Sequence, residues 1–142
     1  MLKQLSVFLE NREGMLLEAT KCLAKSKIDI RALSLADTAD YGILRLVVDR
    51  PDEAVSCLRE AGMTAKLTNV IAVRLADDPG SLNAVLAELG RQEIGAEYAY
   101  AFLEHGADAA CVILRVRECE RAEAALIAAG LSLLGPQDIA AI

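Results

Sequence analysis

Apolar and polar positions alternate at the start of the chain and then change to a helical spacing. The alternation over residues 5–9 predicts a half-buried β-strand. After Gly14, apolar residues recur every three or four positions, at Leu16, Ala19 and Leu23, and this spacing is typical of one helix face. The pattern therefore predicts a strand followed by a helix that packs on it.

Four further elements follow as far as residue 67. Residues 30–35 and 43–48 are apolar and β-branched runs on either side of polar turn residues, which predicts a strand hairpin. The next helix is expected to begin at Pro51 and to end at Gly62, residues typical of a first turn and of a C-terminal cap. Its predicted inner stripe is Ala54, Val55, Leu58 and Ala61. Residues 64–67 form a last predicted strand, so the order is that of a ferredoxin-like unit.

The whole pattern occurs twice. Residues 10–16 return as 76–82, 66 positions later, and residues 58–63 return as 126–131, 68 positions later. The two extra residues fall between the second and third strands, at a hairpin loop where insertions are tolerated. Because the repeats use the whole chain, we predict an α+β protein of two tandem ferredoxin-like βαββαβ modules, residues 1–68 and 69–142. Each module is expected to have an antiparallel sheet with its helices on one face.

Composition and charge narrow the classes of partner that the protein is expected to bind. Of the 142 residues, 54% are hydrophobic and 25% are charged, which is typical of a soluble folded protein. A net charge of -6 and an aromatic content of 4% disfavour nucleic acid. The longest uncharged stretch, residues 124–137, is too short and too broken by Gly and Pro to cross a membrane, and no signal-peptide core precedes it. We expect a cytoplasmic protein that binds neither nucleic acid nor membrane.

Histidine and closely spaced cysteines, which many catalytic and metal sites use, are sparse in this chain. His105 is the single histidine and lies in a predicted hairpin tip, where a solvated side chain is expected. The four cysteines show no CxxC spacing and sit in apolar or helical patterns, as buried thiols of a reducing compartment do: Cys22, Cys57, Cys111 and Cys119. No glycine spacing announces a phosphate loop. We predict no catalytic residue, no metal and no cofactor.

Both repeats place an Asx residue three positions before a glycine that opens a helix, at Asn11 before Gly14 and at Asp77 before Gly80. One interpretation is structural, because Asx side chains cap helices and glycine permits the turn. A functional interpretation is that the N–H groups of the helix N-terminus suit a carboxylate, while the Asx oxygen accepts from an ammonium group. A free α-amino acid carries both groups.

These loops resemble those of the ACT domain. The resemblance is carried by Glu10-Asn11-Arg12-Glu13-Gly14-Met15-Leu16, by Ile28-Asp29-Ile30, and by the second loop, Asp77-Asp78-Pro79-Gly80-Ser81-Leu82. The resemblance covers nearly the whole chain, and the chain as a whole is similar to small stand-alone tandem ACT proteins. It implies a ferredoxin-like module that binds amino acids and regulates metabolic enzymes.

The resemblance also implies the site residues. Asn11 would contact the ligand amino acid, the backbone of residues 12–16 would line the pocket, and Asp29 would contact a ligand held by the neighbouring module. The second repeat keeps Asp77 but has Gly95 where the first has Asp29, so half of the polar pair is absent. The implied ligand-binding residues are Asn11, Arg12, Glu13, Gly14, Met15, Leu16, Asp29, Ile30, Asp77, Asp78, Pro79, Gly80, Ser81 and Leu82.

We therefore predict a non-catalytic regulatory protein that senses a free amino acid. An unpaired sheet edge in each module favours a homodimer. A second hypothesis is a regulatory subunit that docks onto a biosynthetic enzyme, such as the acetohydroxyacid synthase large subunit, and that would co-purify with it. A third is a small acylphosphatase-type hydrolase, for which only Arg12 and Asn11 could furnish the anion-binding loop.

Overall fold

The computed structural model describes residues 1–37, 40–103 and 109–141. Two compact units make up the chain: one is Lys3–Thr68, and the other combines Met1–Leu2 with Asn69–Ile142. The elements of the first half are β1 (Leu2–Glu10), α1 (Met15–Lys25), β2 (Ile30–Asp37), β3 (Tyr41–Val48), α2 (Pro51–Glu60) and β4 (Thr64–Ala76). Those of the second half are α3 (Ser81–Arg91), β5 (Ala96–Leu103), β6 (Ala109–Val116), α4 (Cys119–Ala128), β7 (Ser132–Leu134) and α5 (Pro136–Ala141).

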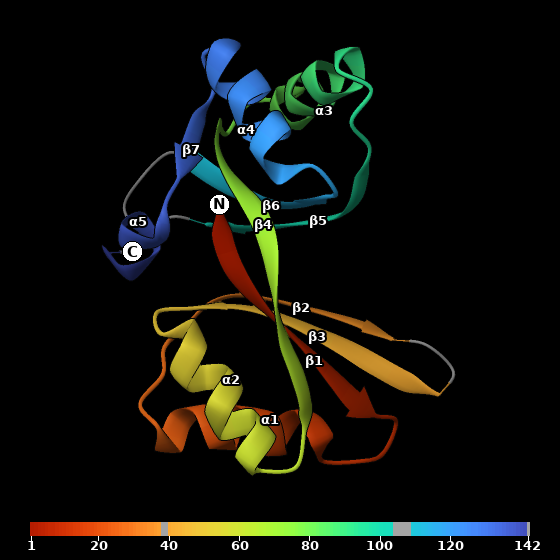
Figure 1. Cartoon of the computed structure of the whole chain (residues 1–142), viewed down its shortest axis with the longest axis vertical. Coiled ribbons are helices and arrows are strands. Elements are labelled where there is room, and N and C mark those ends of the chain that lie inside the picture. Colours follow the sequence, from red (N-terminus) through yellow and green to blue (C-terminus); the bar gives the residue numbers. More distant parts are fainter. Residues whose placement is uncertain (38–39, 104–108, 142) are drawn as a thin grey trace. The chain divides into compact units, whose positions relative to one another are not determined.

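Each unit has one antiparallel sheet with two helices on one face. In the first unit the strand order is β2-β3-β1-β4, and Leu5 of β1 lies opposite Leu46 of β3. In the second unit β6 pairs with both β5 and β4, and β7 pairs with the other side of β4. Helices α1 and α2 cover the first sheet, and α3 and α4 cover the second (Figure 1). The predicted fold, two tandem ferredoxin-like modules, is confirmed.

The first core fills the space between that sheet and helices α1 and α2. Its buried residues are Leu5, Val7, Leu9, Met15, Ala19, Leu23, Ile28, Leu44, Leu46, Val48, Ala54, Val55, Leu58, Met63 and Ala65. Two predicted inner positions are wrong. Leu16 is 41% exposed because Met15, one position before it, lies on the buried face of α1 together with Ala19 and Leu23. Ala61 is exposed because α2 ends at Glu60 and Ala61 is its C-cap.

The second core repeats the first with equivalent residues. It comprises Ile71, Val73, Leu75, Val85, Leu89, Ile94, Val112, Leu114, Val116, Cys119, Ala122 and Leu126. Leu89 of α3 corresponds to Leu23 of α1, and Leu126 of α4 corresponds to Leu58 of α2. The same helix–sheet contact is thus built twice from the same apolar positions.

The strand predicted at residues 64–67 runs on into the second repeat: β4 extends over 13 residues without a break. The opposite face of β1 departs from the simple alternation, because Ser6 is only 5% exposed and Gln4 is fully buried. Both are hydrogen-bonded, since Gln4 Nε2 donates to Ser6 Oγ at 3.1 Å and Ser6 Oγ lies 3.0 Å from Thr68 Oγ1. Buried polar groups are tolerated when paired in this way.

Candidate functional site

Both helix-opening loops turn at a left-handed glycine. Gly14 has φ 85° and is the N-cap of α1, and Gly80 has φ 92° and is the N-cap of α3. A Cβ at either glycine would meet nothing within 4 Å, so the requirement lies in the backbone conformation and not in space. The N-cap position therefore belongs to glycine, and the Asx residue stands three positions further out.

A cavity of about 250 Å³ opens beside the first loop. It is lined by Phe8, Leu9, Glu10, Arg12, Met15, Glu18, Asp40, Tyr41, Ala61, Gly62, Met63 and Thr64. Of the predicted ligand-binding residues, Arg12 and Met15 are on this wall. Asn11, Glu13, Gly14 and Leu16 are adjacent in the chain but do not line the cavity. Its far wall comes from the turn after α2, which no sequence motif indicated.

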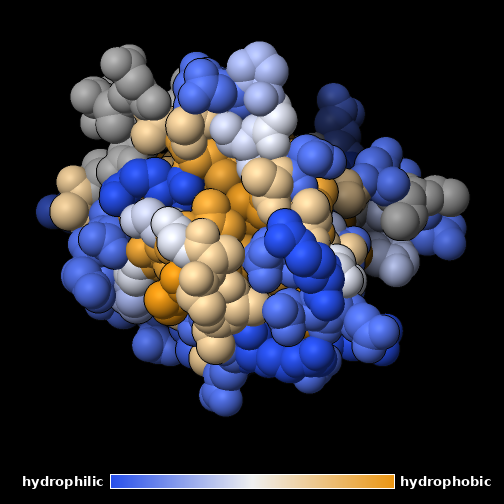
Figure 2. Space-filling view, turned by 90° about the horizontal axis from the view of Figure 1, so that it is seen from above, coloured by the Kyte–Doolittle hydropathy of each residue, from blue (hydrophilic) through white to orange (hydrophobic). Residues whose placement is uncertain are grey.

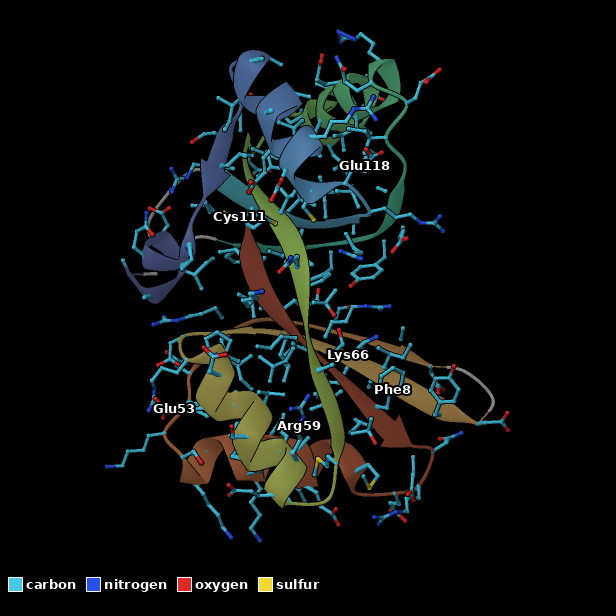
Figure 3. The ribbon with its side chains drawn as sticks, viewed as in Figure 1. Phe8, Glu53, Arg59, Lys66, Cys111 and Glu118 are labelled. Carbon is cyan, nitrogen blue, oxygen red and sulfur yellow. The ribbon has the colours of Figure 1, made fainter. Side chains whose placement is uncertain are left out.

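The cavity combines charges of both signs with an apolar wall. Arg12 Nε lies 3.1 Å from Glu10 Oε2, and its Nη2 lies 3.8 Å from Glu18 Oε2. All three side chains are more than half exposed, so these ion pairs are weak and open to exchange. Phe8 and Tyr41 both line the cavity, and their rings are 6.1 Å apart. Lys66 Nζ lies 5.8 Å from the centre of the Phe8 ring (Figure 3). Such a site offers a partner to each end of a zwitterion.

Asp29 lies at the other end of helix α1 from this cavity. The helix between them has 11 residues, or roughly 16 Å at 1.5 Å per residue. Asp29 Oδ2 pairs with Arg31 Nη1 at 3.3 Å, and its backbone N–H donates to Asp49 Oδ1 at 2.9 Å. Within one unit, Asp29 and its neighbour Ile30 are therefore not brought to the loop that carries Asn11.

Asp49 holds the end of the β3–α2 connection in place. Burial raises the pKa of its carboxyl, but the Asp29 N–H and the Arg50 guanidinium lower it more, and the resulting pKa lies below the ordinary 3.8. Arg50 extends the network, because its Nη2 donates to Ser26 O at 3.0 Å and its Nη1 pairs with Glu53 Oε2 at 2.6 Å. These bonds tie the end of α1 to the start of α2.

The equivalent place in the second unit carries opposite charges. Glu97 stands where the first unit has Arg31, and Arg117 stands where it has Asp49. Arg117 Nε donates to Glu97 Oε1 at 2.9 Å and Arg115 Nε lies 3.4 Å from Glu97 Oε2, and these contacts lower the pKa of Glu97. A cavity of about 350 Å³ lies here, with Gly95 on its wall.

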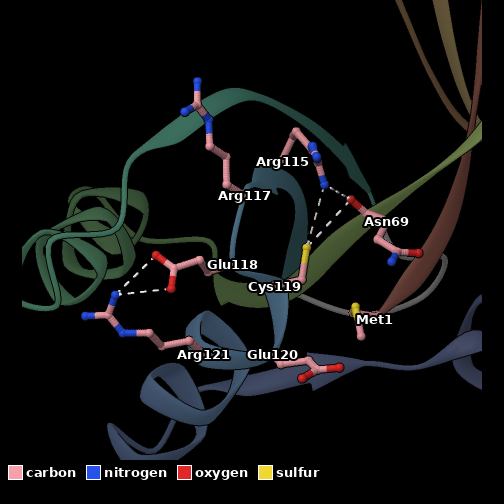
Figure 4. A pocket seen from close by; sticks show the side chains of 8 residues that line it. All are labelled: Met1, Asn69, Arg115, Arg117, Glu118, Cys119, Glu120 and Arg121. Atoms are coloured by element: carbon pink, nitrogen blue, oxygen red, sulfur yellow. Dashed lines mark hydrogen bonds and ion pairs between the residues drawn. The ribbon is translucent and has the colours of Figure 1, made fainter.

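A larger cavity of about 510 Å³ lies at the start of α4 (Figure 4). Its wall consists of Met1, Asn69, Arg115, Arg117, Glu118, Cys119, Glu120 and Arg121. The guanidinium groups are engaged within the protein: Arg115 Nη1 donates to Asn69 O at 2.8 Å, and Arg121 Nη1 pairs with Glu118 Oε1 at 3.2 Å. Sequence reasoning missed this cavity, because its arginines belong to neither loop motif.

The second loop is less enclosed than the first. Asp77, Asp78, Pro79, Gly80 and Leu82 are exposed, Ser81 is half-buried, and none of them lines a cavity described above. The Ser81 N–H donates to Asp78 O at 3.2 Å, which closes the turn onto itself. His105 lies outside the described residues. Within the described residues no group of three His, Cys, Asp or Glu side chains is placed to hold a metal ion, and no helix is long and apolar enough to cross a membrane.

The fold and the twice-used glycine loop define a class of regulatory module. The chain matches the family model described as "ACT domain pair" over residues 1–142, and it belongs to that family. The family predicted from the two loops is therefore confirmed. ACT domains are regulatory modules, and this chain contains two copies of their fold. No match is found among curated proteins.

Solved structures agree with this assignment. The crystal structure of protein BT0572 from Bacteroides thetaiotaomicron is 35% identical, with a TM-score of 0.92, over 99% of this chain and 96% of that one. The ligand-free regulatory subunit of aspartate kinase from Thermus thermophilus is 18% identical, with a TM-score of 0.64, over 89% of this chain and 91% of that one. The regulatory subunit of aspartate kinase from Thermus flavus is 18% identical, with a TM-score of 0.61, over 90% of this chain and 91% of that one. The two kinase subunits share the fold.

Proposed function

We propose that this ACT domain pair senses a free α-amino acid and regulates metabolism through that binding, without catalysis of its own. The observation that carries the proposal is the cavity at the first loop. It combines the Arg12 guanidinium, the carboxylates of Glu10, Glu18 and Asp40, and an apolar wall next to a left-handed glycine.

The chemistry of this cavity fits an amino acid. Arg12 can exchange its exposed partners for the ligand carboxylate, because a guanidinium binds carboxylates in a two-pronged geometry. Glu10 or Glu18, once released from Arg12, can accept hydrogen bonds from the ligand ammonium group. The apolar side chains of Leu9, Met15 and Met63 remain for the ligand side chain. A volume of about 250 Å³ suits a small ligand.

The residues implied by the family resemblance extend this proposal beyond the cavity wall. Asn11 stands next to Arg12 and would contact the ligand directly. Asp29, at the far end of α1, would then serve a ligand held by a neighbouring module, as would Ile30. The loop with Asp77 would bind less well, because its partner position is Gly95.

A panel of the twenty amino acids in a thermal-shift experiment tests the proposal. At about 100 times its dissociation constant the right amino acid adds roughly 2.7 kcal/mol of stability, or several degrees in Tm. Its amide and its decarboxylated amine should give no shift. Arg12→Gln should remove the shift, whereas the matched control Arg91→Gln, which loses only the ion pair of an exposed arginine with Glu88, should keep it. A nucleotide that shifts Tm where no amino acid does would contradict the proposal.

We further propose assembly through the exposed edge of the first sheet. β2 is an edge strand, and its Leu33 and Leu35 are 56% and 47% exposed, which suits pairing with a second copy. A separate set of exposed apolar side chains lies on α3 and α4, at Leu82, Leu86 and Ile127. The space-filling view in Figure 2 shows an apolar area of the surface that is bordered by polar side chains. Mass measurement in solution separates a homodimer from a monomer.

The second candidate function is that of a subunit docked on a biosynthetic enzyme such as acetohydroxyacid synthase. It is favoured by the likeness in fold to structures described as regulatory subunits of aspartate kinase. Purification of the tagged chain from its own cells decides between the two, since a docked subunit brings a much larger chain with it at stoichiometric amount. An isolated homodimer would contradict the docked form.

A further inference from the structure

Two cysteines from neighbouring helices meet in the first unit. Cys22 on α1 and Cys57 on α2 are 35 positions apart in sequence, yet the Cys22 thiol donates to Cys57 Sγ at 2.9 Å. Helices α1 and α2 lie side by side on the same face of the sheet (Figure 1). The two sulfur atoms are already in contact, and a disulfide bond between them requires an approach of only about 0.9 Å.

The pair is accessible to small molecules. Both thiols are half-buried, and they form part of a surface cavity of about 410 Å³. Its wall comprises Glu18, Lys21, Cys22, Lys25, Ser26, Cys57, Glu60, Ala61 and Met63. Burial, followed by the contact with Cys57, raises the pKa of Cys22 to about 11. Cys22 therefore keeps its proton at neutral pH and offers it to the Cys57 sulfur.

We propose that Cys22 and Cys57 form a dithiol site that reacts with small disulfides of the glutathione class and closes into a disulfide between α1 and α2. Cys57 loses its proton to solvent, and its thiolate attacks one sulfur of the oxidant, whose S–S bond breaks and releases one thiolate that takes up a proton. Cys22 then loses its proton to solvent and attacks Cys57 Sγ, which releases the second thiol. Two cysteine thiols are oxidised by two electrons, and one small disulfide is reduced to two thiols.

This site is specific to the first unit. The equivalent positions of the second unit hold Glu88 and Ala125. The remaining thiols, Cys111 and Cys119, are 0% and 6% exposed, and a small disulfide has poor access to them. The chain thus contains its own internal control for reactivity.

The dithiol cavity shares a wall with the candidate amino-acid cavity. Glu18, Ala61 and Met63 line both. A covalent bond between α1 and α2 would therefore restrain the amino-acid cavity as well. This last consequence rests on the proposed function, whereas closure of the disulfide does not.

The experiment treats the reduced full-length protein with oxidised glutathione, quenches with acid, and alkylates the remaining thiols in denaturant. Wild type should lose the mass of two hydrogen atoms, keep two of its four alkylatable thiols and yield a linked Cys22–Cys57 peptide. Its Tm should rise by on the order of 10 °C, because the new bond closes a long loop in the unfolded chain, and dithiothreitol should reverse the change.

Two sets of variants keep the test sharp. Cys22→Ser should stop the reaction at a glutathione adduct on Cys57, and the double variant Cys111→Ala/Cys119→Ala should close the disulfide as wild type does. Four alkylatable thiols after treatment of wild type, a stable glutathione adduct on wild type, or a disulfide between two chains would each overturn the proposal. Amino-acid titration of the reduced and oxidised forms is a separate measurement, so failure of ligand binding leaves the thiol result intact.

Discussion

The two units have the same core and different surfaces. Leu23 and Leu58 of the first unit, and Leu89 and Leu126 of the second, are all at most 1% exposed and occupy matching places on the helices. Both loops also begin their helix at a left-handed glycine. The apolar positions and the two loop glycines are therefore what the repeats must share in order to fold.

The charged positions around this common frame have diverged. Arg31 and Asp49 of the first unit are replaced by Glu97 and Arg117 in the second, which reverses the sign at both places. The first loop borders a cavity with Arg12 on its wall, whereas the second loop is open to solvent. Two modules with one fold but opposite charges at these two positions are not interchangeable as binding sites, and each can be changed separately.

Cavity formation in the cores should have the largest effect and should be the same in both units. Leu23→Ala and Leu89→Ala each remove a fully buried side chain at equivalent positions, so each should lower the free energy of unfolding by about 2–5 kcal/mol. Denaturant unfolding measures both. A loss of less than about 1 kcal/mol in either variant would contradict the equivalence of the cores.

Substitution of the loop glycines should have the second largest effect on stability, because it introduces backbone strain. Gly14→Val and Gly80→Val put a β-branched residue at φ 85° and 92°, which should cost about 1–3 kcal/mol each. Gly90→Ala is the matched control, because this helical glycine also has open space around its Cβ but no positive φ, and alanine there should stabilise by about 0.5–1 kcal/mol. An unchanged Tm in Gly80→Val would mean that the loop accepts another conformation.

The binding sites should differ where the cores do not. Asn11→Ala should weaken amino-acid binding more than tenfold, or about 1.4 kcal/mol, and Asp77→Ala should weaken it less. The reason is that the first repeat has Asp29 to contact a ligand held by a neighbouring module, whereas the second repeat has Gly95 at that position. Calorimetric titration with the amino acid found by thermal shift gives both affinities. A loss confined to the Asp77 variant would assign the site to the other repeat.

The sequence predicted most of the fold because two periodicities, repeated in register, leave little freedom. The strand at residues 64–67 and the turns at Gly14 and Gly80 that open a helix follow from local patterns alone. The failures are at helix ends. Leu16 and Ala61 are predicted on inner faces but are exposed, and they lie in the first turn of α1 and just after the last turn of α2. Neighbouring helix positions differ by about 100° around the axis, so packing, and not apolar spacing alone, decides which residue of a terminal turn faces the core.

The site was less predictable, because its walls come from segments far apart in sequence. The loop motif led to Arg12 and Met15, but the wall formed by Gly62 and Met63 follows from how α2 packs beside α1. The contact between Cys22 and Cys57 has the same origin. Each of these cysteines belongs to an ordinary amphipathic helix, and only the crossing of the two helices brings the sulfurs together.

The smallest expected effect is the pH dependence that the reversed charges create. The pKa of Asp49 is lowered on folding, so its ionised form stabilises the native state above the ordinary value of 3.8, and this contribution is lost as the pH falls through the lower folded pKa. Asp49→Asn keeps an oxygen for the Asp29 N–H but removes the charge, and should cost about 1 kcal/mol at neutral pH and nothing at the acid end.

Glu97→Gln is the matched variant in the second unit. The hydrogen bond from Arg117 is the main cause of the lowered pKa of Glu97, and the sign of its pH dependence is the same. Since the Glu97 side chain is exposed, salt and water screen its ion pairs, and the stability change should be smaller than that of Asp49→Asn. Urea unfolding of both variants and wild type from pH 7 down to acid pH makes the comparison. A larger pH-dependent loss in Glu97→Gln would mean that the reversed ion pair, and not the Asp29–Asp49 contact, is the stronger electrostatic tie.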